Sequence, residues 1–391
     1  MTETAPRTIT VQNWQDPGNL GQSFLQMDRL FPVSVIRAAT PPGAGPLVSR
    51  RLHSFYHLDV PLPDGSRMKV SEVLSRTNTD AWMLLRRNEI LAEEYSGDMD
   101  SGTRHLLMSV SKSVVSAVVG VLVGKGAIDV EKTVEHYIPE LGNSGYQGAR
   151  VRDVLDMRSG IKFSEEYLDR GSEVRRLDEA VGWSTPREGG QTTLKSFLAT
   201  LRQHREHGSY FEYRSCETDV LGWLCEAASG RTFASLASEV LWAPLGARHD
   251  AFITVDSAGT GMFDGGICAT LGDMALFGAM IRDGGLALDG ARILDAAWVE
   301  DIFQGGTDSA EAFAAGPYSD TMPGGQYRSQ FWFLSEDRDT AFCLGIHGQM
   351  VYINPRTGVV GVKFSSQALP VDPFAGPAAA AMFDAISATF A

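Results

Sequence analysis

The chain has 391 residues and a formal net charge of −14, from 48 acidic and 34 basic side chains. This balance disfavours nucleic acids and anionic membranes as partners, because both attract basic surfaces. Hydrophobic residues make up 43% of the sequence and charged residues 21%, which is typical of a soluble globular protein with one large domain or two interleaved lobes.

At the N-terminus, residues 1–6 have neither the basic nor the apolar stretch of a signal peptide. No later apolar run is long enough to span a bilayer. We therefore expect a cytoplasmic protein whose four cysteines, none in Cys-x-x-Cys spacing, are reduced and buried. Residues 1–75 are rich in Pro, Gly and Arg and are predicted to be a covering segment, with the main domain at residues 76–391.

The main domain is predicted to begin with a β-hairpin, because two apolar strand-like runs, 81–85 and 90–95, flank a short polar turn. The later elements are predicted in this order: helices at 109–124, 151–157, 218–229, 232–241 and 269–283, strands at 330–334, 340–345, 350–354 and 359–364, and a final helix at 377–390. These elements predict a fold of the α/β (α+β) class. Strands at both ends predict one antiparallel sheet built from both chain ends and flanked by helices, with a helical region inserted at about residues 125–265.

Ser-x-x-Lys occurs three times, beginning at Ser66, Ser109 and Ser159. Ser66 follows turn residues, and Ser159 precedes a glycine typical of a helix end. Only Ser109 starts an unbroken helical run. In that run Lys112 lies one turn after Ser109 on the same helix face. A serine needs an adjacent base to act as a nucleophile, and a helix N-terminus offers free N–H groups to an oxyanion. This pattern favours Ser109 as a catalytic nucleophile.

Two more segments complete the pattern. Tyr213 and Ser215 precede a capped helix, and residues 345–349, Gly-Ile-His-Gly-Gln, fall on a predicted strand. With Ser109 and the stretches 242–246 and 265–275, they resemble in order and spacing the penicillin-recognising serine hydrolases of the β-lactamase superfamily. The resemblance is strongest to the 6-aminohexanoate-dimer (nylon oligomer) hydrolases, relatives of class C β-lactamases that cleave a linear amide. It covers roughly residue 80 to the end and implies a β-lactamase-like fold.

The resemblance also implies roles for single residues. Ser109 would be the acylated nucleophile and Lys112 with Tyr213 its base system. The backbone N–H groups of Ser109 and Ile346 would form the oxyanion hole. Substrate-binding roles are implied for Tyr167, a loop residue closing over substrate, for Asp178 and Asp264 at the amine-bearing end, and for Ser215 and His347.

The base system has a simple physical form. A lysine beside a tyrosine shares one proton with it, so the two titrate as a pair. Burial is expected to lower the pKa of Lys112, and the ammonium to lower that of Tyr213. Either group could then take the serine proton and return it to a leaving amine.

Two departures from the superfamily pattern matter. Ser215 stands where many members have Asn, and the 345–349 segment lacks the Lys that helps β-lactam-handling relatives bind a carboxylate. The β-lactamase interpretation is weakened accordingly. His347 is equally consistent with a structural histidine and with a substrate contact. A tyrosine at a position like that of Tyr167 is more often a surface loop residue than a lid, and aspartates such as Asp178 and Asp264 are more often solvated or capping residues.

The sequence thus predicts a serine hydrolase for small linear amides and short-chain esters, without metal or cofactor. The alternatives are a carboxylesterase of the same fold with little amidase activity, or a penicillin-binding, β-lactamase-like protein. The expected partner is a small amide or ester substrate rather than nucleic acid or membrane, and a homodimer is compatible with the sequence.

Overall fold

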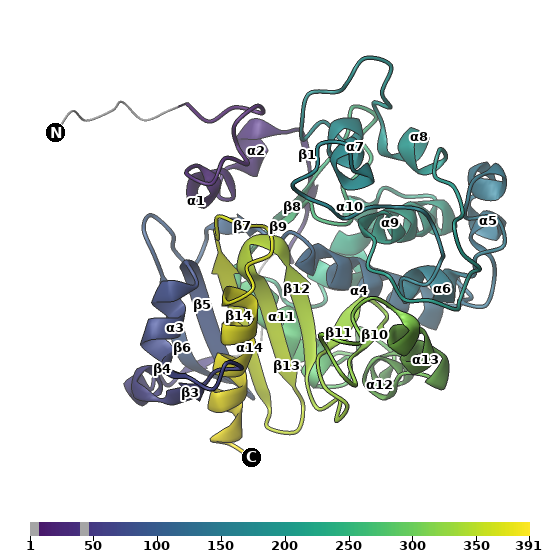
Figure 1. Ribbon diagram of the computed structural model, residues 1–391. Coiled ribbons are helices and arrows are strands. Elements are labelled where there is room, and N and C mark those ends of the chain that lie inside the picture. The colour runs from purple at the N-terminus through teal and green to yellow at the C-terminus, as the bar shows by residue number, and fades with distance from the viewer. Residues whose placement is uncertain (1–7, 40–46) are drawn as a thin grey trace.

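The computed structural model describes residues 8–39 and 47–391 of the chain. Its largest sheet has eight strands in the order β10-β11-β12-β13-β14-β5-β6-β2 (Figure 1). Their bounds are β2 Val48–Ser49, β5 Thr79–Arg86, β6 Glu89–Tyr95, β10 Gln326–Arg328, β11 Phe331–Phe333, β12 Ala341–Gly345, β13 Gln349–Asn354 and β14 Val359–Ser365. β5 pairs antiparallel with β14, so the sheet does join the two ends of the chain as predicted. Only the two-residue β2 runs parallel to its neighbour within the described part of this sheet.

Helices cover both faces of this sheet (Figure 1). α11 (Leu271–Arg282) packs on one face, against β5, β13 and β14. α14 (Ala375–Ala388) and α3 (Val70–Arg76) cover the other. Every residue of β13 and β14 is therefore buried, including polar ones such as Lys363. Gly278 allows α11 to approach the sheet closely, since a Cβ at this position would lie 2.6 Å from the Val360 side chain on β14.

A second sheet, in the order β1-β8-β9-β7, lies next to the start of the long apolar helix. Its strands are β1 Val33–Ile36, β7 Arg104–Leu106, β8 Ala251–Thr254 and β9 Ile267–Thr270. The helix predicted from residue 269 was therefore wrong at its start, because residues 267–270 are a buried strand. The Thr270 hydroxyl accepts a hydrogen bond from the Asp273 N–H, which caps α11 one residue later.

The inserted region is helical as predicted (Figure 1, teal). The long apolar helix α4 Val110–Gly124 precedes it, and its elements are α5 Val134–Tyr137, η2 Pro139–Asn143, α6 Val151–Leu155, α7 Glu173–Ala180, α8 Leu194–Leu198, α9 Ser215–Ser229, α10 Phe233–Ala237 and the π-helical turn η3 Ser238–Trp242. Two predicted boundaries shift. α9 begins three residues before the predicted 218, and α6 ends at Leu155 because Met157 has a φ of 53°, outside the helical region.

The remaining elements complete the two lobes. They are α1 Leu20–Ser23, α2 Met27–Leu30, η1 His53–His57, the hairpin β3 Asp59–Pro61 and β4 Arg67–Lys69, α12 Ala296–Gln304, α13 Thr307–Ala315 and η4 Ile346–Gly348. The N-terminal residues 8–39 pack toward the helical region: the buried Trp14 donates from its indole to the Trp183 carbonyl at 2.9 Å. All four cysteines are buried and unpaired, as expected.

Candidate active site

Ser109 lies at the start of α4, in the interior of the molecule. Thirteen residues of α4, from Val110 to Leu122, are buried, as its apolar composition predicts. Met108 just before Ser109 has a φ of 47°, a conformation that costs a non-glycine residue free energy and is common where a side chain must be aimed. The chain thus enters the helix through a sharp turn that presents the serine hydroxyl, which is 9% exposed.

Lys112 is fully enclosed and uses its ammonium group on three acceptors. Nζ lies 3.0 Å from Ser109 Oγ, 3.2 Å from Ser215 Oγ and 2.7 Å from the Asp264 carbonyl oxygen. Three acceptors match the three hydrogens of an ammonium ion. The sequence-predicted pair of Ser109 and Lys112 is therefore in direct contact, one helical turn apart.

The charge state of Lys112 differs from the sequence-based expectation. Burial alone would lower its pKa, but Tyr213, Asp264, Glu165 and the buried Asp219 act together in the opposite direction. The Asp264 carboxylate lies 3.6 Å from Nζ. The net effect raises the pKa of Lys112, so the resting lysine is a cation rather than a neutral base.

Tyr213 lies over the same two residues. Its ring is 5.4 Å from Lys112 Nζ and stacks on Trp332 with centroids 5.3 Å apart. Burial raises the pKa of Tyr213, while the Lys112 ammonium and a hydrogen bond with Ser109 oppose that rise. The structure therefore brings together Ser109, Lys112 and Tyr213, with aromatic packing that fixes the orientation of the phenol.

The predicted oxyanion segment meets the nucleophile from the end of β12. A Cβ on Gly345 would lie 3.1 Å from the Ser109 backbone nitrogen, so glycine permits close approach of the two backbones. Residues 345–349 were predicted to lie on a single strand. This prediction was wrong for Ile346–Gly348, which form a 3-10 turn in which His347 has a φ of 61°. This turn leads the chain past Ser109 before β13 begins.

His347 holds that turn instead of contributing charge. Its Nδ1 lies 2.6 Å from the Gln367 carbonyl oxygen, and burial lowers the pKa of His347 despite this bond. The ring packs edge-on against Phe24 of the N-terminal segment. A neutral imidazole that donates to Gln367 agrees with the structural interpretation of this residue.

The two aspartates are buried, and neither is a surface side chain. Each is 5% exposed. Burial raises the pKa of Asp178 to about 6, with Asp264 adding to the rise and Arg175 opposing it. Arg175 donates to Asp178 at 2.7 Å. The buried Oδ1 of Asp264 has no hydrogen-bond partner among the described residues, which leaves an acceptor free beside Lys112.

The family model for Beta-lactamase matches residues 70–384. The chain belongs to the beta-lactamase family. It is 39% identical over 358 residues to the 6-aminohexanoate-dimer hydrolase of Paenarthrobacter ureafaciens, a match covering 91% of this chain and 88% of that protein.

Solved structures confirm the β-lactamase-like fold. A candidate 6-aminohexanoate-dimer hydrolase from Bacillus anthracis superposes with a TM-score of 0.89 and 23% identity over 99% of this chain and 98% of that one. A family VIII carboxylesterase superposes with a TM-score of 0.60 and 16% identity over 81% and 96%. The family makes this protein a hydrolase.

Sequence reasoning missed one prominent residue of this beta-lactamase family member. Glu165 accepts hydrogen bonds from the Ser215 N–H and, at 2.5 Å, from the Tyr167 hydroxyl. Burial raises the pKa of Glu165, and the Lys112 cation opposes the rise. The carboxylate thus ties the Tyr167 loop to the start of α9. A glutamate in a polar loop gives no sequence signal, because only the fold brings it to α9.

Residues 8–39 and 47–391 are the part of the chain that the structure describes. They contain no cluster of three His, Cys, Asp or Glu side chains arranged to hold a metal ion. They also contain no helix long and apolar enough to cross a membrane.

Proposed function

We propose that this protein hydrolyses small linear amides resembling 6-aminohexanoate oligomers, together with short-chain esters, through an acyl-enzyme on Ser109. The observation that carries the proposal is the hydrogen bond from the Lys112 ammonium to Ser109 Oγ, with Tyr213 packed over both. The 39% identity to a 6-aminohexanoate-dimer hydrolase supports the substrate class.

In the proposed first half-reaction, Lys112 and Tyr213 share a single proton, which is carried by Lys112 and leaves Tyr213 as a phenolate. Ser109 Oγ attacks the amide carbonyl carbon and gives its proton to this phenolate. Because the pKa of Lys112 is raised, its ammonium serves to stabilise the tyrosine phenolate and not to take the proton itself. The N–H groups of Ser109 and Ile346 receive the developing oxyanion, and such a donor is typically worth about 3–4 kcal/mol of barrier. Tyr213 then returns the proton to the leaving amine.

In the second half-reaction a water molecule attacks the Ser109 ester and passes its proton to the same pair. The carboxylic acid leaves and the serine hydroxyl is restored. Asp178 and the unpartnered oxygen of Asp264 would bind the substrate ammonium, because a buried cation needs an anionic partner.

One observation favours the carboxylesterase alternative. Asp178 already has Arg175 as a partner at 2.7 Å, so an incoming ammonium must compete for it. An ester without an amine would not depend on that exchange. The two functions therefore differ in what happens at Asp178 and not in the chemistry at Ser109.

A turnover screen separates the candidates. The enzyme and its Ser109→Ala variant would be assayed with a short p-nitrophenyl ester, the linear 6-aminohexanoate dimer and a chromogenic cephalosporin. We expect ester and dimer turnover by the wild type alone. Ester turnover without dimer cleavage would identify a carboxylesterase, and efficient cephalosporin turnover would overturn the proposal.

A further inference from the structure

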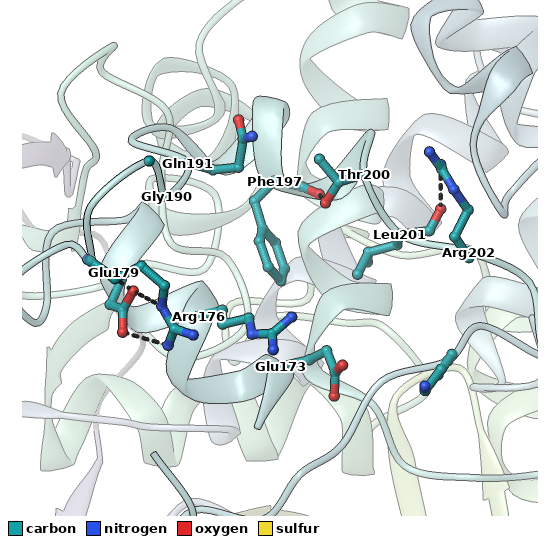
Figure 2. A pocket seen from close by; sticks show the side chains of 12 residues that line it. Glu173, Arg176, Glu179, Gly190, Gln191, Phe197, Thr200, Leu201 and Arg202 are labelled. Atoms are coloured by element: carbon teal, nitrogen blue, oxygen red, sulfur yellow. Dashed lines mark hydrogen bonds and ion pairs between the residues drawn. The ribbon is translucent and has the colours of Figure 1, made fainter. Parts of the chain in front are cut away.

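A cavity of about 450 Å³ opens on the helical region, between α7, α8 and the loop at residues 187–191 (Figure 2). None of its lining residues contacts Ser109, Lys112 or Tyr213 through a hydrogen bond of the described structure. Its volume lies in the range of small-molecule sites. It therefore calls for an explanation separate from the catalytic chemistry.

Positive charge is concentrated at this cavity, although the whole chain carries −14. Lys162, Arg176 and Arg202 all line it, and none of the three forms an ion pair with a described residue. The fourth cation, Arg187, is neutralised by two close contacts with Glu179, at 2.6 and 2.7 Å.

The other acid at the cavity is Glu173, and one of its oxygens accepts the Ser164 N–H at 3.1 Å. The cavity lining thus holds three cations without an ion pair and one partly occupied carboxylate, and of these cations Arg202 donates to the Leu201 carbonyl oxygen at 3.3 Å. An anion placed among them would gain charge-assisted hydrogen bonds without displacing an existing ion pair.

The floor of the cavity is apolar. Phe197 and Leu201 line it and are 4% and 5% exposed. In the view of Figure 2, the Phe197 ring is drawn between the side chains of Arg176 and Arg202. Apolar surface flanked by guanidinium groups suits a ligand with a short hydrocarbon chain and an anionic end.

The position of the cavity on α7 relates it to the active site. With 3.6 residues per turn, Glu173, Arg176 and Glu179 share one side of this helix, and Asp178 falls on the opposite side. Asp178 is buried whereas Arg176 is exposed. A ligand held by Arg176 would therefore contact the outer side of the helix whose inner side carries Asp178.

We propose that this cavity is a second binding site, separate from the catalytic serine, for a short aliphatic carboxylate. The carboxylate lies among Arg176, Arg202 and Lys162, and the chain lies on Phe197 and Leu201. A simple fatty acid and an ω-amino acid share this chemistry, so the test includes both.

The test is calorimetric titration of the full-length protein after its active site has been blocked with a fluorophosphonate, with untreated protein run in parallel. The probes are hexanoate, 6-aminohexanoate and hexylamine. Both carboxylates should bind to blocked protein, more weakly at high salt, and hexylamine should not. Comparing the Kd values of hexanoate and 6-aminohexanoate shows whether the site prefers a simple fatty acid or an ω-amino acid. The heat of binding does not depend on turnover. The binding result can therefore be interpreted even if the proposed hydrolase function is wrong.

Variants locate the binding. The double change Arg176→Gln with Arg202→Gln should raise the Kd for hexanoate by about tenfold or more, because two charge-assisted contacts are lost. Arg67→Gln, at an exposed position on β4, removes one positive charge away from the cavity and should leave the Kd unchanged. Lys162→Glu, a charge reversal at an exposed side chain, should weaken binding as well. No binding to blocked wild-type protein, equal binding of hexylamine, or an unchanged Kd in the double variant would overturn the proposal.

Discussion

Replacing Asp178 with Asn should impair amide hydrolysis far more than ester hydrolysis. Asp178 is 5% exposed, so a substrate ammonium that binds it leaves water for a buried carboxylate. Asn has nearly the same shape and can still accept a hydrogen bond from Arg175, but it lacks the charge that an ammonium needs. A short ester has no amine and should be insensitive to the change.

The magnitude follows from the contact that is lost. A hydrogen bond to a charged group is worth about 1.5–3 kcal/mol, which corresponds to a loss of roughly 10- to 150-fold in kcat/KM for the linear dimer. Arg175 already occupies Asp178 at 2.7 Å and would share it with the substrate, so the lower end of this range is expected.

The pH dependence provides a second readout of the same group. Burial raises the pKa of Asp178 to about 6. Because the carboxylate form binds the ammonium, the ratio of amide to ester activity should fall as the pH drops through about 6. In Asp178→Asn this fall should disappear, since no group remains at that position to titrate.

The assay compares kcat/KM for the linear dimer and a short p-nitrophenyl ester across this pH range, with a melting curve for each variant. Glu166→Gln is the matched control, because it removes an exposed carboxylate from the loop that precedes the same helix. An unchanged dimer rate in Asp178→Asn would refute the amine-pocket reasoning. Equal losses on both substrates with a lower Tm would show a defect in folding instead.

Three further predictions follow from the buried charges. Lys112→Ala and Tyr213→Phe should each lower ester kcat by orders of magnitude, and the double variant should cost little more than the worse single one, because the pair acts as one unit; additive losses would contradict this. Glu165→Gln should shift the acid limb of the ester pH profile, on which Tyr213 gains its proton, to lower pH, because the Glu165 charge raises the pKa of Tyr213; an unmoved limb would exclude that influence. Burial raises the pKa of Glu217 from 4.5 to about 8, so its contribution to stability is present at low pH and is lost as the pH rises through this interval. Tm measured against pH should therefore decline less in Glu217→Gln than in the wild type, and parallel curves would contradict the assignment.

Local sequence patterns were sufficient for the central sheet and the nucleophile helix. The strands predicted at 350–354 and 359–364 correspond to β13 and β14, and the start of α4 placed Ser109 and Lys112 one turn apart, where they contact each other. These features depend on periodicity and on spacing within a single element, which the sequence contains directly.

Features that depend on contacts between distant segments were not predictable in the same way. The raised pKa of Lys112 results from groups far away in sequence, first Tyr213 and then the carboxylates of Asp264, Glu165 and Asp219. Residues 269 and 270 were assigned to the start of a helix, and only the pairing of β9 with β7 and β8 decides for a strand there. The turn at His347 depends on its bond to Gln367, twenty residues later.

The most direct test of the account is whether Ser109 carries the acyl group during turnover. The enzyme would be quenched with acid while it hydrolyses a short p-nitrophenyl ester, and its peptides analysed by mass spectrometry. The account predicts an added acyl mass on the peptide containing Ser109, absent from Ser109→Ala, whose hydrolysis should also be abolished. An acyl group on another residue, or near wild-type hydrolysis by Ser109→Ala, would contradict it.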